Sequence, residues 1–322
     1  MLFIVTRGSL WDALLSRDGV RVLTVTPASN SALGGPLLLF GSRSSRADRA
    51  LRVCAIAIAA WLVITLSAVV HYARSAGDMT ALVAHLLALG MVCFVVLRDE
   101  RAPLLLRDWL PLLFLPFLYI EARWPIAGLG RAHADATVHS WELAFFPSDP
   151  SRTLATQWHA LLLSEALHLA YLSYYVLIYL PPAVLYLRGV RGGFAETMLA
   201  LSVAFGACFT AFLLFPVDGP RFVNGGAAAP DGPVRALTLA LLNGASTRGT
   251  AFPSSHVAAS VVATVCALRF SRPLGYLLIP VTLALMVATV YGGFHYAVDV
   301  MAGLVVGAAS LVVAAFIWKA LE

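Results

Sequence analysis

Two histidines lie in short polar motifs of a chain that is otherwise rich in apolar residues. His256 follows a Pro-Ser-Ser sequence, and His295 precedes Asp299 by four residues. Residues four apart share one face of a helix, so the Asp299 carboxylate is positioned to hold one ring nitrogen of His295. The other nitrogen is then free to act as a nucleophile or a base. This spacing predicts covalent or acid–base chemistry.

The segments that lead to these histidines carry groups suited to binding a phosphate. Ser254 and Ser255 occupy a predicted helix start, where hydroxyl groups and free backbone N–H groups favour an anion. Arg221 lies in a Gly-Pro turn, and its planar guanidinium offers two donors to one phosphate. Arg235 and Arg248 lie in the same loop and are alternative phosphate ligands. Together with the histidines, these residues predict phosphoryl transfer.

The elements that must position these residues are membrane helices. Of the 322 residues, 60% are hydrophobic and 12% are charged, and the mean hydropathy is +0.84. Globular soluble domains average about 45–50% apolar and about 25% charged residues. This composition excludes a soluble enzyme, a disordered chain and a collagen-like chain. The four cysteines lie inside apolar runs without a short spacing between them, which argues against a disulfide framework or a zinc site.

Eight apolar runs are long enough, or nearly so, to cross a bilayer, and they predict an all-α polytopic membrane protein of about eight transmembrane helices. The runs are 51–72, 80–97, 103–120, 159–187, 194–216, 255–270, 273–291 and 296–318. The preceding residues, 1–50, predict an Arg-rich cytoplasmic tail. Between the runs, residues 121–158 carry tryptophans among charges and prolines and predict a helix at the headgroup level, whereas 217–254 is rich in Gly and Pro.

The basic residues predict the orientation of these helices. There are 22 Lys and Arg residues against 17 Asp and Glu, and in a membrane protein this excess marks cytoplasmic loops rather than nucleic-acid binding. When the N-terminus is placed in the cytoplasm, 15 of the 22 basic residues, including those of the tail, lie on the inner side and seven lie on the outer side. Both termini are then cytoplasmic, and the polar motifs lie on the outer face. We therefore expect a plasma (inner) membrane protein of bacterial type whose site faces the periplasm.

The motifs around the two histidines resemble those of the type 2 phosphatidic acid phosphatase superfamily, which contains lipid phosphatases and phosphotransferases. The second motif reads Pro253-Ser254-Ser255-His256, and the third ends in His295-Tyr296-Ala297-Val298-Asp299. The resemblance implies a six-helix core over residues 103–319, with two extra transmembrane helices over 51–102. It also implies that His295 is the nucleophile, Asp299 its orienting partner and His256 the acid that protonates the leaving alcohol. No metal and no cofactor are implied.

In two motifs the sequence departs from the phosphatase pattern. Ala288-Thr289 stands where the phosphatases carry a Ser-Arg pair before the histidine of the third motif. In the first motif, Leu214 replaces a lysine and Phe222 replaces the proline after the arginine. Thr289 and the run Asp299–Gly303 look more like the inositol phosphorylceramide synthase and sphingomyelin synthase branch. Thr289 is therefore a further candidate for phosphate binding.

Glu165 and His168 lie about two turns into the helix predicted over 159–187. One interpretation is that they recognise the headgroup or an acceptor, a role that Arg248 could share. The other is that they form a satisfied polar pair between packed helices. The sequence leaves both interpretations open.

These residues favour a lipid phosphate phosphatase that acts through a phosphohistidine intermediate. A lipid phosphotransferase would use the same residues and move a phospho-headgroup to a ceramide- or diacylglycerol-like acceptor instead of water. A non-catalytic lipid-binding or transport protein is the alternative from another class, although transport favours inverted repeats and discontinuous helices that the sequence does not clearly show. The expected partners are a lipid phosphate and membrane lipids, and no nucleic acid.

Overall fold

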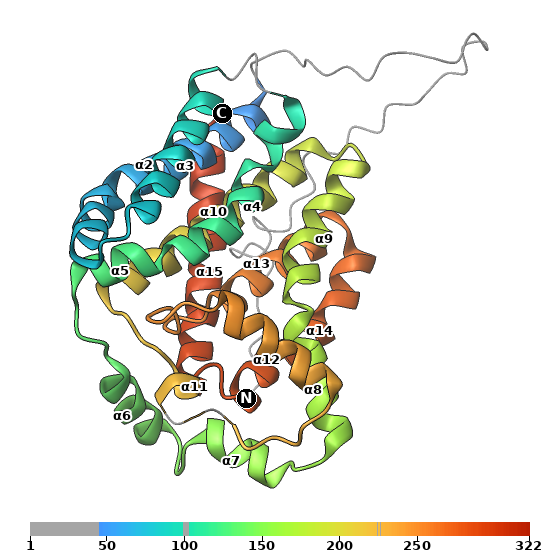
Figure 1. Ribbon diagram of the computed structural model, residues 1–322. Coiled ribbons are helices and arrows are strands. Elements are labelled where there is room, and N and C mark those ends of the chain that lie inside the picture. The colour runs from blue at the N-terminus through green and yellow to red at the C-terminus, as the bar shows by residue number, and fades with distance from the viewer. Residues whose placement is uncertain (1–44, 99–102, 224, 226) are drawn as a thin grey trace. The chain divides into compact units, whose positions relative to one another are not determined.

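The structure is a computed structural model that describes residues 45–98, 103–223, 225 and 227–322. Residues 1–44 of the predicted tail lie outside the described residues and stay a prediction, whereas residues 46–50 belong to the first described helix. The described segments form helices and loops, with one isolated bridge between Val217 and Thr250 (Figure 1).

Each of the eight predicted apolar runs is helical. The helices are α2 (Arg46–Ala76), α3 (Met79–Leu97), α4 (Leu104–Glu121), α8 (Leu161–Leu172) with α9 (Tyr174–Leu187), α10 (Arg191–Leu214), α13 (Ser255–Phe270), α14 (Arg272–Tyr291) and α15 (Ala297–Ala320). Among the described residues, α2, α3, α10, α14 and α15 are each long and apolar enough to cross a membrane, and the pair α8 and α9 is a sixth span if taken together. The chain is an all-α polytopic membrane protein.

The helices α4 and α13 differ from these spans in charge and in length. α4 contains Arg107, Asp108 and Glu121. α13 has 16 residues, and a helix of that length extends about 24 Å, against about 30 Å for the hydrocarbon core of a bilayer. Most α13 residues are buried against neighbouring helices, so α13 lies inside the helix bundle.

The apolar run at 159–187 is broken at Ser173, although Pro181 and Pro182 lie inside α9. The two helices meet at an angle of 42°. The Ser173 hydroxyl donates to the Ala170 carbonyl at 2.6 Å, and such bonds back to the preceding turn favour bending. The bend separates Tyr171 from Tyr174, and both rings contact His256.

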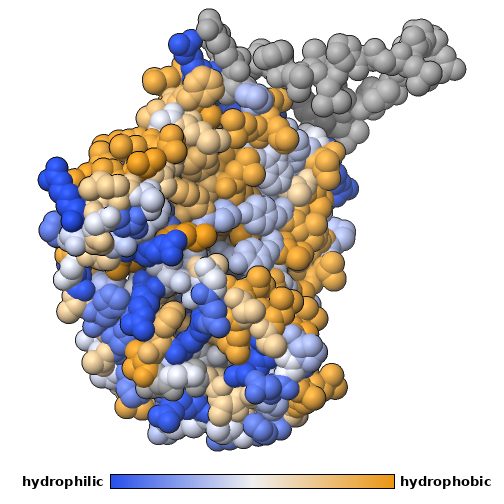
Figure 2. Space-filling model, in the orientation of Figure 1, coloured by the Kyte–Doolittle hydropathy of each residue, from blue (hydrophilic) through white to orange (hydrophobic). Residues whose placement is uncertain are grey.

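The outer surface of the long helices is apolar. Figure 2 shows hydrophobic residues over much of the face that carries α3, α9 and α14, and hydrophilic residues gathered toward the end where α6 and α7 lie. Large apolar side chains such as Leu97, Leu187 and Phe316 are exposed by 79%, 85% and 70%. Water would make such exposure unfavourable, whereas acyl chains are its natural surroundings.

Two glycines of α15 allow it to pack closely on α13. A Cβ at Gly303 would lie 2.6 Å from the Ser254 carbonyl oxygen, and one at Gly307 would lie 2.9 Å from that of Ala258. Small residues of this kind let membrane helices approach backbone to backbone. The Ser254 N–H also donates to the Asp299 carbonyl at 3.0 Å, so the first turns of α13 and α15 are held side by side.

The segments between the long helices carry short helices at the same end of the bundle as these first turns. Residues 121–158, expected to hold one interfacial helix, form α5 (Arg123–Leu129), α6 (Asp135–Phe145) and α7 (Pro150–Gln157). The Gly- and Pro-rich residues 217–254 contain α11 (Pro220–Val223) and α12 (Pro233–Ala245). Composition alone did not predict α12, whose first turn is capped from another helix by the Glu165 carboxylate.

Basic residues meet acidic ones at the opposite end of the bundle. Arg191 pairs with Asp48 and Asp108, and Arg46 pairs with Glu322 at 2.5 Å. These contacts place the start of α2 beside the end of α15. The described chain therefore begins and ends on the same side of the helix bundle.

Candidate active site

The two histidines singled out in the sequence lie together in the structure. His256 is the second residue of α13. His295 lies in the turn between α14 and α15, because α15 begins at Ala297 rather than at the histidine as the spacing suggested. Their ring centroids are 5.6 Å apart, and both rings line one pocket of about 40 Å³ together with Arg221.

The His295 ring is held by a backbone carbonyl as well as by a carboxylate. Its Nδ1 lies 2.9 Å from the Ala251 carbonyl oxygen and 3.4 Å from Asp299 Oδ2. A carbonyl oxygen only accepts hydrogen bonds, so Nδ1 carries the proton. Nε2 then carries the lone pair, which is the state a nucleophile requires.

Asp299 also caps the start of α15. Its Oδ2 accepts a hydrogen bond from the backbone N–H of Tyr296 at 2.8 Å and completes a capping box. The carboxylate is fully buried. It therefore fixes the turn that carries His295 as well as facing the ring.

His256 is enclosed by two tyrosines from the broken helix. Its Nε2 lies 3.2 Å from the Tyr171 hydroxyl, and the two rings are stacked with centroids 5.0 Å apart. The Tyr174 ring centroid lies 4.2 Å from that of His256. The His256 Nδ1 is buried and has no hydrogen-bond partner in the described part of the chain. This nitrogen therefore has an unused capacity for one hydrogen bond.

Arg221 supplies positive charge to the pocket. Its guanidinium donates to Ser246 Oγ at 3.0 Å and to the Asn243 side chain, and no carboxylate pairs with it among the described residues. Asp218 also lines the pocket, but its carboxylate accepts from His133 Nδ1 at 2.7 Å. An arginine bonded only to neutral groups keeps its full charge for an anion.

A glycine brings the Arg221 turn against the His295 turn. Gly219 has a φ of 87°, which L side chains rarely adopt. A Cβ there would lie 2.9 Å from the Phe294 carbonyl oxygen. A glycine at position 219 is therefore required by both conformation and space.

For the phosphoryl transfer that the sequence predicts, replacing Arg221 by glutamine is expected to lower kcat/KM for a lipid phosphate by about 10²-fold, because the developing charge on phosphorus loses its cation. Arg221→Lys should recover only part of this, since lysine lacks the planar pair of donors. The matched control is Arg248→Gln. Arg248 is 65% exposed, pairs with Asp218 at 3.6 Å and does not line the pocket, so its loss should leave kcat/KM nearly unchanged. The reverse pattern would make Arg248 the phosphate ligand.

The other predicted phosphate ligands, Ser254, Ser255 and Thr289, do not line this pocket. Ser254 Oγ caps α13 by accepting from Val257 N at 3.4 Å, and Ser255 lines an apolar cavity beside His256. The Thr289 hydroxyl donates to the Met286 carbonyl of its own helix at 2.7 Å. The Thr289 carbonyl instead accepts from the backbone N–H of His295 at 3.1 Å, so Thr289 shapes the turn.

Glu165 and His168 lie outside the pocket. Both Glu165 oxygens accept backbone N–H groups at the start of α12, at 2.8 Å from Val234 and 3.0 Å from Arg235. His168 Nδ1 donates to the Ser164 carbonyl at 2.7 Å, and its ring lies 5.9 Å from that of Phe294. This geometry favours the interpretation of satisfied polar groups between packed helices.

An apolar cavity of about 110 Å³ adjoins the pocket. The two share Tyr119, Tyr171, Leu242, Ser246 and His256. Most of the remaining lining residues are apolar and aromatic side chains of α4, α9, α10 and α12. A charged pocket and an apolar cavity thus meet at one histidine.

Tyr171 and the Ala251 carbonyl were not identified from the sequence. Tyr171 lies 85 residues from His256, and Ala251 lies 44 residues from His295. Neither residue belongs to a spacing that secondary structure makes regular, so no local signal could have found them.

A comparison with known protein families matches the part of the chain that carries most of this site. A family model described as the PAP2 superfamily matches residues 138–313, a range that includes Arg221, His256, His295 and Asp299. No curated protein and no solved structure matches the chain.

Proposed function

Because the chain belongs to the PAP2 superfamily, and so is an integral membrane protein with a phosphatase- or phosphotransferase-type activity, we propose that it hydrolyses a membrane lipid phosphate through a phosphohistidine, without a metal ion. One observation carries the proposal. A single pocket is lined by two histidines and by Arg221, which pairs with no carboxylate among the described residues, and an apolar cavity opens beside one of these histidines.

In the first half-reaction the lone pair of His295 Nε2 attacks phosphorus, and the bond from phosphorus to the lipid oxygen breaks. The Nδ1–H of His295 stays on the Ala251 carbonyl and faces Asp299, which stabilises the positive charge that develops on the ring. The negative charge of the bound phosphate favours the protonated form of His256, which then gives its proton to the departing alkoxide, so a neutral lipid alcohol leaves. Arg221 offsets the charge on the transferring phosphoryl oxygens.

In the second half-reaction water attacks the phosphohistidine. His256, now neutral, accepts one proton from the water as its oxygen bonds to phosphorus and the bond to Nε2 breaks. Inorganic phosphate leaves, and both histidines return to their starting states. The same histidine serves as acid and then as base.

The apolar cavity supports a lipid as the leaving group. It reaches the phosphate pocket at His256, which is the group that must lie beside the departing oxygen. A chain attached to that oxygen would enter the cavity among the side chains of α4, α9, α10 and α12. Transfer of such a chain from water to an apolar wall is favourable.

A lipid phosphotransferase of the inositol phosphorylceramide synthase type is the second candidate, and a second cavity favours it. This cavity of about 330 Å³ lies between α2, α4 and α10, and it shares Leu115, Phe205 and Phe209 with the first. A second lipid chain held there would place an acceptor next to the donor. The acceptor hydroxyl would then replace water in the second half-reaction.

We also propose which end of the bundle faces the cytoplasm, which membrane holds the protein and how the chain is divided. The end that gathers Arg46, Arg191 and Arg269 would face the cytoplasm with both termini, which puts the pocket on the outer face of the plasma membrane. The division is into the tail 1–50, two extra helices over 51–102 and the core 103–319. A cysteine-accessibility map of intact cells would test the orientation.

The test is phosphate release by detergent-purified protein in EDTA, with phosphatidic acid, polyprenyl phosphates and sphingoid phosphates as substrates. Release supports the metal-independent phosphatase. If no phosphate appears, but mass spectrometry finds headgroup transfer to ceramide or diacylglycerol, the transferase is correct. If neither product forms, the chemistry proposed for the histidines is wrong and lipid binding or transport is the better account.

A further inference from the structure

The helix α6 carries two acidic residues that belong to none of the motifs. Asp135 and Glu142 are seven residues apart, so they lie two turns apart on one face of the helix. Glu142 is fully buried, and Asp135 is 9% exposed. Buried carboxylates are costly unless they receive hydrogen bonds, so their partners indicate what they do.

Asp135 holds the turn that leads to Arg221. Its two oxygens accept the backbone N–H groups of Asp218 and Gly219, each at 2.9 Å. Its Oδ1 also lies 3.5 Å from the Tyr296 hydroxyl. Arg221 follows this turn directly as the second residue of α11.

Glu142 holds the first turn of α15, immediately after His295. Its two oxygens accept the backbone N–H groups of Ala297 and Val298, each at 3.0 Å. These N–H groups have no partner within the helix, and a carboxylate at a helix N-terminus is favourable. One helix outside the long spans therefore bonds to both loops that line the pocket.

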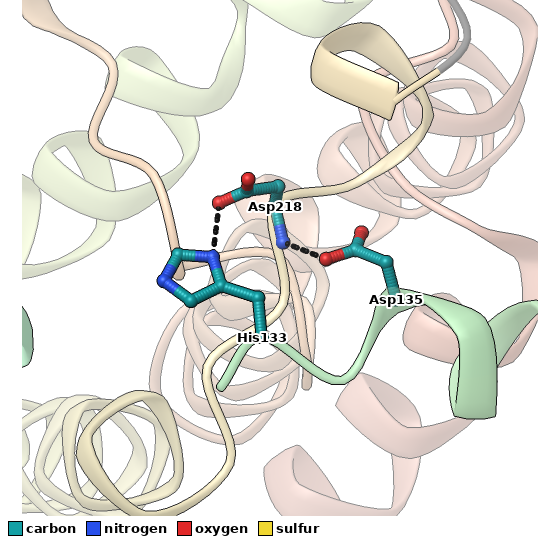
Figure 3. Close-up of side chains that lie close together, drawn as sticks. All are labelled: His133, Asp135 and Asp218. Carbon is teal, nitrogen blue, oxygen red and sulfur yellow. Dashed lines mark hydrogen bonds and ion pairs between the residues drawn. The ribbon is translucent and has the colours of Figure 1, made fainter. Parts of the chain in front are cut away.

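Figure 3 shows His133, Asp135 and Asp218 close together, a set of residue types that could also bind a metal ion. Their oxygens already face donors. Asp135 accepts the two backbone N–H groups, and Asp218 Oδ1 accepts from His133 Nδ1 and from Gly249 N at 2.8 Å. Asp218 Oδ2 lies 3.6 Å from Arg248. The cluster therefore ties loops to one another and carries no separate metal proposal.

We propose that Asp135 and Glu142 are positioning residues, which keep the Arg221 loop and the His295 turn at the separation that lets both meet one phosphoryl group. This inference rests on the proposed function. The two residues do not line the pocket and would act through the backbone. An error of about 1 Å in such positions is enough to cost about 10²-fold in rate.

The kinetic test compares Asp135→Asn and Glu142→Gln with the wild type on its best substrate. Each amide keeps the shape of the side chain but replaces one acceptor oxygen by an N–H₂ group that faces a donor. We expect kcat to fall by about 10- to 100-fold per folded molecule while KM changes little. The matched control is Asp149→Asn, because Asp149 caps α7 through Ser151 N at 3.0 Å, lies 3.5 Å from His139 of α6 and bonds to neither loop.

A double-mutant cycle separates positioning from general stability. If Asp135 acts through Arg221, then Asp135→Asn should add little to Arg221→Gln, whereas Glu142→Gln should add its full effect. Equal losses in Asp149→Asn and Glu142→Gln would overturn the proposal. So would a loss explained wholly by a smaller folded fraction, or additive effects for Asp135 and Arg221.

Amide hydrogen exchange keeps the test independent of the proposed function. Glu142→Gln should speed exchange at Ala297 and Val298, and Asp135→Asn should speed exchange at Asp218 and Gly219, with the core of α13 unchanged. If the wild type transfers no phosphoryl group but these exchange rates change, the proposed function is wrong while the positioning role of Asp135 and Glu142 is supported. If the exchange rates do not change, that positioning role is wrong.

Discussion

Replacing His295 by alanine is expected to abolish phosphate release, a loss of at least about 10³-fold in kcat/KM, because the nitrogen that bonds to phosphorus is removed. The wild type should also yield a phosphorylated protein whose N–P bond is labile in acid, and the variant should yield none. Both quantities are measured on detergent-purified protein in EDTA. The loss should appear in kcat more than in KM, because Arg221 and the apolar cavity remain.

The control for this substitution is His159→Ala. His159 is exposed and lies just before α8, so its removal should leave the phosphate release unchanged. A His295→Ala protein that is folded and retains most of the wild-type rate would show that His295 is not the nucleophile. Retained binding of a lipid phosphate without turnover is the result expected from the proposed mechanism.

Replacing His256 by alanine is expected to cost about 10²- to 10⁴-fold on a lipid phosphate, because an alkoxide then leaves without a proton. An aryl phosphate with a far more acidic leaving group does not need that proton. The first half-reaction of His256→Ala on such a substrate should therefore stay within about 10-fold of the wild type. The measurement is the burst of leaving-group release, which is phenolate from the aryl phosphate and lipid alcohol from the lipid phosphate.

A His256 that acts only as a structural residue would give a different result. Loss of packing against Tyr171 and Tyr174 would lower the rate on both substrates by the same factor. Equal losses would therefore contradict the role of His256 as the acid. Persistence of the burst on the aryl substrate, together with its loss on the lipid, would assign the proton transfer.

The helices and the candidate catalytic histidines were predictable from the sequence, because both depend on local patterns. Long apolar runs must satisfy their backbone hydrogen bonds internally in a bilayer, so each forms a helix, and all eight predicted runs are helical. The two histidines stand out because polar motifs rarely interrupt such runs. The break of the run 159–187 at Ser173 was harder to predict, because the pair Pro181 and Pro182 is a stronger local signal for a break.

The partners of these residues were not predictable, because they come from distant parts of the chain. Spacing suggested Asp299 as the partner of His295, yet Nδ1 lies closer to the Ala251 carbonyl. Thr289 aligned with a cation position, but its hydroxyl bonds to its own helix. A side chain's direction depends on helix rotation and packing, and neither follows from the order of residues alone.

Hydropathy and composition are properties of the chain, so the order of residues was enough to predict a helical membrane protein and the polar residues that interrupt its apolar runs. Which of those residues meet depends on how the helices pack. The close packing of α13 on α15 at Gly303, and the bonds from Glu142 to the start of α15, depend on backbones that touch after folding. Those contacts set the distance between the two histidines, and catalysis depends on that distance far more steeply than folding does.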